Sequence, residues 1–128
     1  MAYTYDTDNV FAKILRAEIP NTTVLETDHT LAFRDINPQA PEHILVIPKG
    51  AYVTFDDFAA NASDAEIVDY NRAIATICDA LKVAPGMGGQ GYRLISNAGH
   101  DGVQDVPHLH VHILAGRRLG AMLKAAGS

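Results

Sequence analysis

The sequence has a single cysteine and no tryptophan among its 128 residues. With Cys78 alone, the chain forms neither an internal disulfide nor a thiolate metal cluster, which fits a reducing cytoplasm. No apolar run reaches the roughly 18 residues that a membrane-spanning helix needs, and the N-terminal residues carry neither a basic leader nor an apolar stretch. We therefore expect a cytoplasmic protein that is neither secreted nor inserted in a membrane.

Basic residues are also scarce. Lys and Arg number 10 against 15 Asp and Glu, which gives a formal net charge of -5, and no block of five or more basic residues occurs. DNA and anionic membranes bind basic surfaces, so we expect neither as a partner. Any anionic ligand must be held by local geometry.

What is present fits one globular domain. Hydrophobic residues make up 48% of the chain and charged residues 20%, which is enough apolar material for a sizeable core. Single cores usually close at roughly 100 to 200 residues, so we expect one domain over residues 1–128. Within it, residues 1–7 are predicted to be flexible and residues 117–128 to form a C-terminal tail.

Local patterns predict an α+β domain. Asp8 is a candidate cap for a short helix over residues 9–17, which Pro20 ends. Ser63 and Glu66 have capping-box spacing, and the apolar residues after them predict a long helix over residues 64–82. The β-prone stretches are residues 22–26, 30–34, 43–48, 92–97 and 108–115. This order favours a mostly antiparallel five-stranded sheet with one long and one short helix.

Half of the six histidines lie within five residues, at His108, His110 and His112. Side chains alternate along a strand, so the three share one face while the apolar residues between them take the other. A neutral imidazole has one nitrogen with a nucleophilic lone pair and one that donates a hydrogen bond. One histidine can therefore attack, one can hold the charge of a ligand, and one can orient its neighbour.

Two other interpretations of the histidines stay open at this point. They could merely cover a solvent-facing sheet surface, although three in register is an unusual choice for solubility. They could also bind zinc or copper, with His43, His100 or Asp105 completing the ligand set. Spacing alone does not decide between these and catalysis.

Together with segments upstream, the three histidines resemble the histidine triad (HIT) superfamily, specifically its Hint branch of purine nucleoside phosphoramidases. The resemblance runs through four ordered blocks, residues 10–20, 32–41, 43–49 and 97–117. Related nucleotidyl transferases carry glutamine where this chain has His112, which favours a hydrolase. The resemblance implies a HIT-like fold, no cofactor, no metal, and a homodimer formed through the long helix and the strand over residues 91–97.

The resemblance also implies a catalytic group of four histidines. His110 would attack the α-phosphorus of a nucleoside monophosphate ester or amide, giving a nucleotidyl-histidine intermediate that water cleaves. His108 and His112 would bracket the phosphate and tune the tautomer of His110. His43 would lie beside them across the sheet.

The remaining implied residues bind the nucleotide. Asp35 would accept hydrogen bonds from the two ribose hydroxyls. Phosphate oxygens would be contacted by Asn97 and by the backbone around Val103, Gln104 and Asp105. The apolar residues expected to wall a purine pocket, each of which also fits plain core packing, are Phe11, Ile14, Ile19, Phe33 and Ile36.

Two positions depart from the animal members of the family, which have glycine and serine where this chain has Val103 and Asp105. A carboxylate at position 105 would repel a phosphate at contact distance. We expect Asp105 either to turn outward or to be protonated, in which case it could act as general acid for the departing amine. Val103 adds bulk beside the phosphate and predicts a different substrate preference.

The leading functional prediction is a metal-independent nucleoside phosphoramidase. It would hydrolyse the phosphorus–nitrogen bond of purine nucleoside phosphoramidates and related aminoacyl nucleotides, binding AMP- or GMP-type nucleotides. The alternatives are a dinucleoside polyphosphate hydrolase, a nucleotide-binding protein with little turnover, and a metal-binding module.

Overall fold

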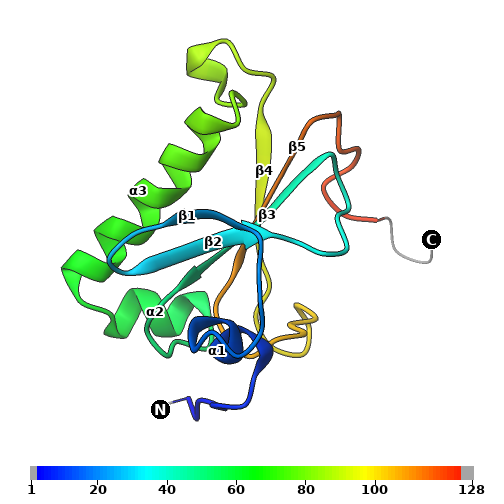
Figure 1. Ribbon diagram of the computed structural model, residues 1–128. Helices are drawn as coiled ribbons and strands as arrows, with labels where there is room; N and C mark the ends of the chain where they lie inside the picture. The colour runs from blue at the N-terminus through cyan, green and yellow to red at the C-terminus, as the bar shows by residue number, and fades with distance from the viewer. Residues whose placement is uncertain (1–2, 125–128) are drawn as a thin grey trace.

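The structure, a computed structural model, describes residues 3–124. Within this range one antiparallel sheet has the strand order β1-β2-β3-β5-β4 (Figure 1). The strands are β1 (Thr23–Glu26), β2 (Thr30–Arg34), β3 (Glu42–Pro48), β4 (Tyr92–Ser96) and β5 (Val111–Ala115). The helices are α1 (Val10–Leu15), α2 (Phe55–Asn61), α3 (Asp64–Ala80) and the 3-10 turn η1 (Pro85–Met87). The predicted fold class and antiparallel five-stranded sheet are confirmed.

The first helix is shorter than predicted and has a different cap. Asn9, rather than Asp8, is the N-cap, because its side chain accepts a hydrogen bond from the Ala12 N–H at 2.9 Å. The helix ends at Leu15, and Ala17 takes a left-handed φ of 61° that turns the chain before Pro20. The sequence pattern therefore located α1 but overestimated its length at both ends.

The helix α2 was not predicted, so the expectation of one long and one short helix is wrong by one element. Thr54 caps α2 by accepting a hydrogen bond from the Asp57 N–H at 3.3 Å. Phe58 is the one buried side chain of this seven-residue helix. A single apolar anchor has no period, so hydrophobic periodicity does not reveal it.

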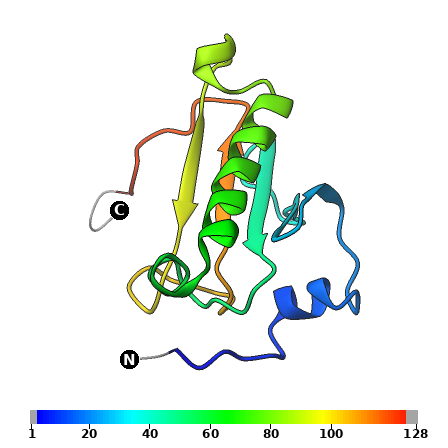
Figure 2. The same cartoon turned by 90° about the vertical axis from the view of Figure 1, so that its left-hand side faces the viewer.

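The long helix α3 follows the sequence pattern closely. Its capping box is present, with the Glu66 N–H donating to Ser63 Oγ at 3.2 Å and the Ser63 N–H donating to Glu66 Oε1 at 3.0 Å. The helix lies in front of the sheet, over β3 and β5, in the view of Figure 2. Its buried residues are Tyr70, Ala73, Ile77 and Cys78.

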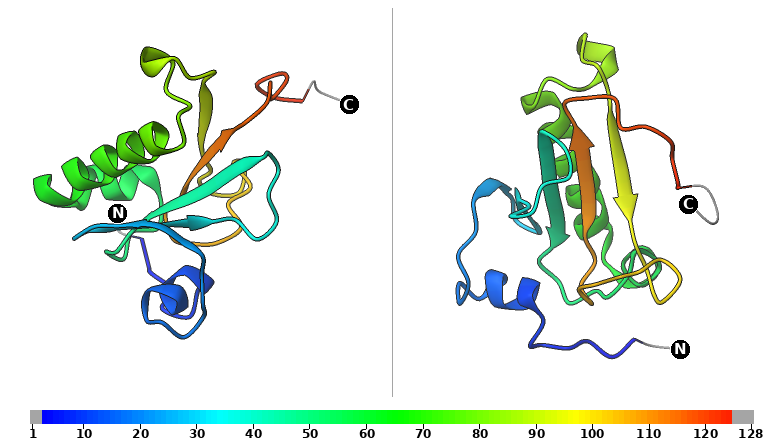
Figure 3. Two further views of the ribbon diagram at one scale, coloured as in Figure 1. Left: turned by 45° about the horizontal axis from the view of Figure 1, so that its top comes forward. Right: turned by 90° about the vertical axis from the view of Figure 1, so that its right-hand side faces the viewer.

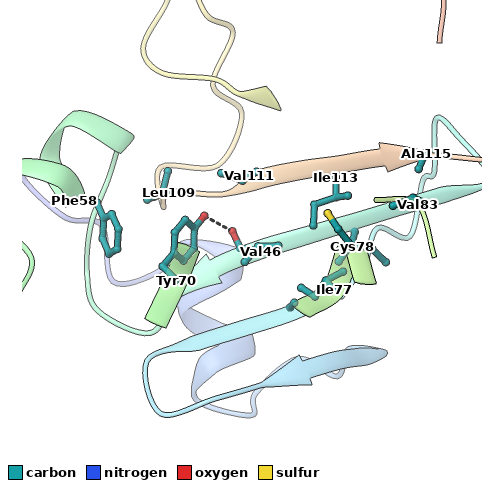
Figure 4. Packing of buried hydrophobic residues seen from close by; sticks show 12 residues of the cluster. Val46, Phe58, Tyr70, Ile77, Cys78, Val83, Leu109, Val111, Ile113 and Ala115 are labelled. Carbon is teal, nitrogen blue, oxygen red and sulfur yellow. Dashed lines mark hydrogen bonds between the residues drawn. The ribbon is translucent and has the colours of Figure 1, made fainter. Parts of the chain in front are cut away.

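Alternation along the strands divides the core between the two faces of the sheet. On β3, Ile44 and Val46 belong to the cluster under α3, while Leu45 and Ile47 belong to a second cluster with Phe11 of α1. Figure 4 shows the α3 cluster, where the buried Tyr70 hydroxyl donates to the Val46 carbonyl at 2.7 Å. Figure 3 shows the other face, with α1 on the side away from α3.

The last strand begins later than predicted. β5 starts at Val111, which is opposite Val46 of β3 and Ser96 of β4, so His108 to His110 precede the strand. The alternation nevertheless extends back through this segment, because the Leu109 side chain lies in the α3 cluster and the Leu109 N–H donates to the Tyr52 carbonyl at 2.8 Å. The three histidines therefore still share the face opposite α3.

No helix within residues 3–124 combines the length and apolar character needed to cross a membrane.

Two predictions concern the ends of the chain. The flexibility of residues 1–7 stays a prediction: residues 1–2 lie outside the described range, while the Tyr3 hydroxyl donates to Asp56 at 2.6 Å. Of the predicted tail, residues 125–128 lie outside the described range, and Arg117 donates to the Gln39 carbonyl at 2.9 Å.

Candidate active site

Four histidines lie in a row on the sheet face opposite α3. The rings of His43 and His112 are 5.1 Å apart, as are those of His112 and His110. Phe11 packs edge-on against His110, with ring centroids 4.9 Å apart, and lies 6.3 Å from the ring of His108. The sheet and α1 thus bring together all four histidines named from the sequence.

The backbone determines the tautomer of His110. Its Nδ1 lies 2.7 Å from the carbonyl oxygen of His108, which can only accept a hydrogen bond. Nδ1 of the neutral ring therefore carries the proton, and Nε2 has a free lone pair. The ring is almost fully buried, so this lone pair is held in a fixed direction. The arrangement is that of a positioned nitrogen nucleophile.

A second chain of hydrogen bonds determines the tautomers of His43 and His112. The Gln39 N–H donates to His43 Nδ1 at 3.0 Å, so the proton of the neutral His43 ring lies on Nε2. His43 Nε2 lies 2.9 Å from His112 Nδ1, which therefore accepts. The proton of neutral His112 must lie on Nε2, the ring nitrogen not used in this chain. His112 thus presents a hydrogen-bond donor next to the nucleophile.

Burial keeps these rings neutral. It lowers the pKa of His112 to about 4, with a smaller contribution from the neighbouring His110 and His43. Burial also lowers the pKa of His43, against the opposing charge of Asp35. Both rings are therefore uncharged near neutral pH, as their hydrogen bonds require.

His108 has a different place from the one expected. Its Nε2 donates to the Pro48 carbonyl at 2.8 Å, and its Nδ1 accepts from the Tyr5 hydroxyl at 2.6 Å. The ring is fully buried, and burial lowers its pKa to about 4. With both nitrogens engaged, the His108 ring has none left to bracket a phosphate. It contributes instead through its carbonyl, which orients His110.

An apolar pocket of about 220 Å³ opens beside the histidines. Its lining includes every residue expected to wall a purine site, namely Phe11, Ile14, Ile19, Phe33 and Ile36. Ile36 lies at the rim of the pocket, since the residue is 90% exposed. A larger hollow of about 680 Å³ lies between α1 and β1. No histidine among residues 3–124 lines either hollow, but the smaller one is lined by Phe11, Asp35 and Asp105, which contact His110 or His43. We assign the candidate site to the smaller pocket because of these contacts with the histidines and not because of its volume.

Asp35 and Asp105 supply carboxylates at this pocket. Asp35 Oδ1 accepts the Asn37 N–H at 2.8 Å, and Oδ2 lies 3.4 Å from His43 Nε2. The Asp105 side chain is 79% exposed, yet its Oδ1 lies 3.5 Å from His110 Nε2. Asp105 therefore points largely outward while one oxygen still faces the nucleophile. Its suggested role as a general acid stays a prediction.

The loop between β4 and β5 departs from expectation. The N–H groups of Val103 and Gln104 donate within the loop, to the His100 and Gly99 carbonyls at 3.1 Å each, so they are not available to a phosphate. The Gln104 amide donates to the Val53 carbonyl at 2.7 Å and braces the loop. Val103 and Asn97 do not line the pocket. The expected phosphate contact of Asn97 stays a prediction.

Comparison with known proteins identifies the family. The sequence model of the HIT domain matches residues 16–119. The chain belongs to the HIT domain family. Its fold and histidine row are those that the sequence led us to expect of a histidine triad protein, and the resemblance drawn from the sequence is confirmed. HIT proteins are nucleotide-binding hydrolases at the level of the family.

Individual HIT relatives cover almost the whole chain. An uncharacterised 13.2 kDa HIT-like protein of Azospirillum brasilense is 61% identical over 96% of this chain and 98% of its own length. The purine nucleoside phosphoramidase of Escherichia coli is 42% identical over 94% of this chain and 97% of its own. A histidine triad protein from Clostridium difficile superposes with a TM-score of 0.77 at 40% identity, covering 92% of this chain and 98% of its own.

The candidate metal ligands of this HIT protein agree only in part with those proposed from the sequence, which included His43 and His112 but not Asp35. Asp35, His43 and His112 each offer a ligand atom within 4.8 Å of the others. His100 is fully exposed and lies against Asp101, and the Asp105 carboxylate faces His110, so neither completes this group. An ion held by His43 and His112 would have to replace the hydrogen bond that joins their rings.

Sequence reasoning missed the groups that orient the histidines of this HIT protein. They are the Tyr5 hydroxyl, the Gln39 N–H and the Pro48 carbonyl. Two of the three are backbone groups, whose role is independent of the side chain at that position. Tyr5 lies 103 residues from His108 in the sequence, and no local pattern connects them.

Proposed function

We propose that this protein hydrolyses the phosphorus–nitrogen bond of purine nucleoside phosphoramidates and related aminoacyl nucleotides. The observation that carries the proposal is the fixed lone pair on His110 Nε2, which faces a residue of the apolar pocket, Asp105, at 3.5 Å. The name of the Escherichia coli relative, purine nucleoside phosphoramidase, supports this choice among hydrolase activities.

The first step forms a nucleotidyl-histidine. The Nε2 lone pair of His110 bonds to the α-phosphorus while the phosphorus–nitrogen bond breaks, and the leaving nitrogen takes a proton from solvent and departs as an amine. His110 becomes a cationic N-phosphoryl imidazolium whose Nδ1–H stays on the His108 carbonyl. The Nε2–H of His112 donates to a phosphoryl oxygen and stabilises charge that grows in the transition state.

The second step releases the nucleotide. Water bonds to the phosphorus, the bond to His110 Nε2 breaks, and its electron pair returns to the ring. The water loses one proton, which replaces the proton taken by the amine. The sum is phosphoramidate plus water giving nucleoside monophosphate plus amine.

The nucleotide itself would occupy the apolar pocket. A purine ring gains contact with Phe11 and Phe33, which also pack edge-on against each other at 5.7 Å. Asp35, with a side chain 19% exposed, has acceptor capacity left for the ribose hydroxyls. The pocket and the carboxylate thus account for purine and ribose without a basic side chain.

We also propose a homodimer through α3 and β4. β4 is an edge strand of the sheet, and an unpaired edge invites association. Large apolar residues there remain half exposed, including Leu94 of β4 at 45% and Val68 of α3 at 48%. An apolar hollow of about 320 Å³ separates α3 from β4. A monomeric mass by light scattering at micromolar concentration would contradict this proposal. A cytoplasmic location stays a prediction.

The test is release of AMP from adenosine 5′-phosphoramidate by the purified protein, with a strong chelator present throughout. We expect release that the chelator does not slow. AMP binding without release would instead support a binding protein, and release lost to the chelator would support a metal site. Faster cleavage of diadenosine triphosphate would support the dinucleotide hydrolase.

A further inference from the structure

The Asp105 carboxylate occupies space beside the nucleophile. Its Oδ1 accepts the Val106 N–H at 2.9 Å and lies 3.5 Å from His110 Nε2. A phosphorus atom must come to about 3–3.5 Å from Nε2 before it can react. An oxygen of Asp105 therefore lies about as far from Nε2 as the reacting phosphorus has to come, so the carboxylate and the phosphoryl group share the space around Nε2 unless the side chain rotates.

Rotation moves the carboxylate but does not remove its charge from the site. The side chain is 79% exposed, so it has solvent to rotate into. The backbone that carries it is held, because the Gln104 amide is bonded to the Val53 carbonyl at 2.7 Å and to the Val106 carbonyl at 3.1 Å. The negative charge thus stays within the length of one short side chain from the reacting phosphorus.

The nearby charges do not cancel that of Asp105. The pocket lining contains two acids, Asp35 and Asp105, and one cation, Arg34. Arg34 is already paired with Glu42 at 3.1 Å. A ligand in this site therefore meets a negative surface next to the nucleophile, in a protein whose net charge is also negative.

We propose that Asp105 determines leaving-group specificity, favouring phosphoramidates whose leaving amine carries a positive charge. It disfavours anionic leaving groups, including polyphosphates. The inference rests on the proposed function, since it presupposes that an amine leaves. A unit charge on the leaving group, about 6 Å from the Asp105 carboxylate in a water-like medium, changes kcat/KM about threefold relative to an uncharged leaving group. Added salt reduces this change.

The activity test uses three adenosine 5′-phosphoramidates that differ in the far end of the amine: 1,3-diaminopropane (cationic), propylamine (neutral) and β-alanine (anionic). We expect kcat/KM to fall in that order for the wild-type protein, by about tenfold from first to last at low salt. In Asp105→Asn the three values should lie within about twofold of each other. Asparagine keeps an oxygen to accept the Val106 N–H, so this change removes charge with little change of shape.

The matched control is Asp101→Asn. Asp101 lies in the same loop, its side chain is fully exposed, and its partner is the exposed His100 at 3.0 Å rather than a histidine of the site. This variant has the same net charge as Asp105→Asn. It should keep the wild-type order of substrates, which separates a local effect of Asp105 from a change in overall charge.

A binding test keeps the inference separate from the proposed function. Asp105→Asn should bind AMP at least about threefold more tightly and bind uncharged adenosine as the wild type does. Unchanged AMP affinity, or an unchanged substrate order in Asp105→Asn, overturns the role of Asp105. If the wild type cleaves none of the three phosphoramidates, the proposed function is overturned. The AMP and adenosine affinities of Asp105→Asn then still test whether Asp105 repels a phosphate.

Discussion

The side chains on the two faces of residues 108–115 are stabilised by different interactions. Leu109, Val111 and Ile113 pack under α3 in a hydrophobic cluster. The intervening histidines lie on the other face, where each ring has at least one hydrogen bond of fixed direction. One stretch of chain therefore contributes to the core on one side and to the candidate chemistry on the other.

The contrast separates the residues that determine stability from those that determine activity. Apolar contacts under α3 depend on volume and tolerate exchange among similar side chains. The histidine face depends on donors and acceptors that lie far apart in the chain, such as the Gln39 N–H and the Pro48 carbonyl. Changes on the α3 face should accordingly alter stability without altering turnover per folded molecule, whereas changes on the histidine face should alter turnover.

The largest effect should come from His110→Ala. Loss of the nucleophile should lower phosphoramidate turnover by about a thousandfold or more. The free energy of unfolding should fall as well, by about 1–3 kcal/mol, because the buried ring packs against Phe11 and is hydrogen-bonded to the His108 carbonyl, so turnover is compared per folded molecule. Steady-state kinetics and urea unfolding of the same preparation measure both. Turnover near the wild-type value would exclude His110 as nucleophile.

Ile77→Ala should change stability alone. Ile77 is fully buried between α3 and the sheet, so the cavity left behind should cost about 2–5 kcal/mol of unfolding free energy. Turnover per folded molecule should not change. Arg72→Ala, at an exposed position of the same helix, is the control and should cost about 0.5 kcal/mol or less. Equal losses in the two variants would contradict the assignment of the core.

Asp35→Ala tests the nucleotide contact of the histidine face. Loss of a charged acceptor should weaken AMP binding by about 1–3 kcal/mol, measured by calorimetry. Glu42→Ala, which removes an acid paired with Arg34 nearby, serves as control and should have a smaller effect. An AMP dissociation constant unchanged in Asp35→Ala would remove this residue from the site.

Acid should act on stability through the two histidines whose pKa burial lowers to about 4, His108 and His112. Burial lowers the pKa of His108 to about 4, while an unfolded histidine titrates near 6.5. Between these values the unfolded chain binds more protons, so stability falls as the pH falls. We expect His108 to contribute a loss of roughly 1.5 kcal/mol between pH 6.5 and 5, measured by urea unfolding. The exposed His100 is the control: His100→Gln should leave this slope unchanged. A flat profile over this range would show that His108 is not held neutral.

The smallest effects should come from two residues with left-handed backbone, one near each face. Lys82 after α3 has a φ of 60°, and Val103 in the loop beside the site has a φ of 56°. Glycine relieves this strain, so Lys82→Gly and Val103→Gly should each raise the unfolding free energy by about 0.5–1 kcal/mol. Arg72→Gly, within α3, should instead lower it by about 1 kcal/mol. Destabilisation by all three would contradict the backbone geometry.

Much of the fold could be predicted because its signals are local. The Ser63 and Glu66 capping box marks the start of α3 within one residue, and the short apolar stretch before Lys49 marks β3. The first residue of β5 could not be predicted, because pairing begins where β3 and β4 offer partners, opposite Val111. Strand ends depend on neighbouring strands, which a single stretch of sequence does not contain.

The candidate site divides in the same way. Alternation correctly placed the three histidines on one face, because it is a property of any extended chain. It could not assign their ring nitrogens, which depend on contacts such as Tyr5 with His108, 103 residues apart. For that reason the expected phosphate contact of the His108 ring was wrong, whereas the expected influence of His108 on the tautomer of His110 agrees with the hydrogen bond between His110 Nδ1 and the His108 carbonyl.

The most direct test of the account is detection of the covalent intermediate. The protein is mixed with adenosine 5′-phosphoramidate for milliseconds, quenched in alkali, where a phosphorus–nitrogen bond to histidine survives, and analysed by intact mass and peptide sequencing. We predict a mass increase of one adenylyl group on His110, absent from His110→Ala. Turnover with no adduct at any quench time, or an adduct on another residue, would contradict nucleophilic attack by His110.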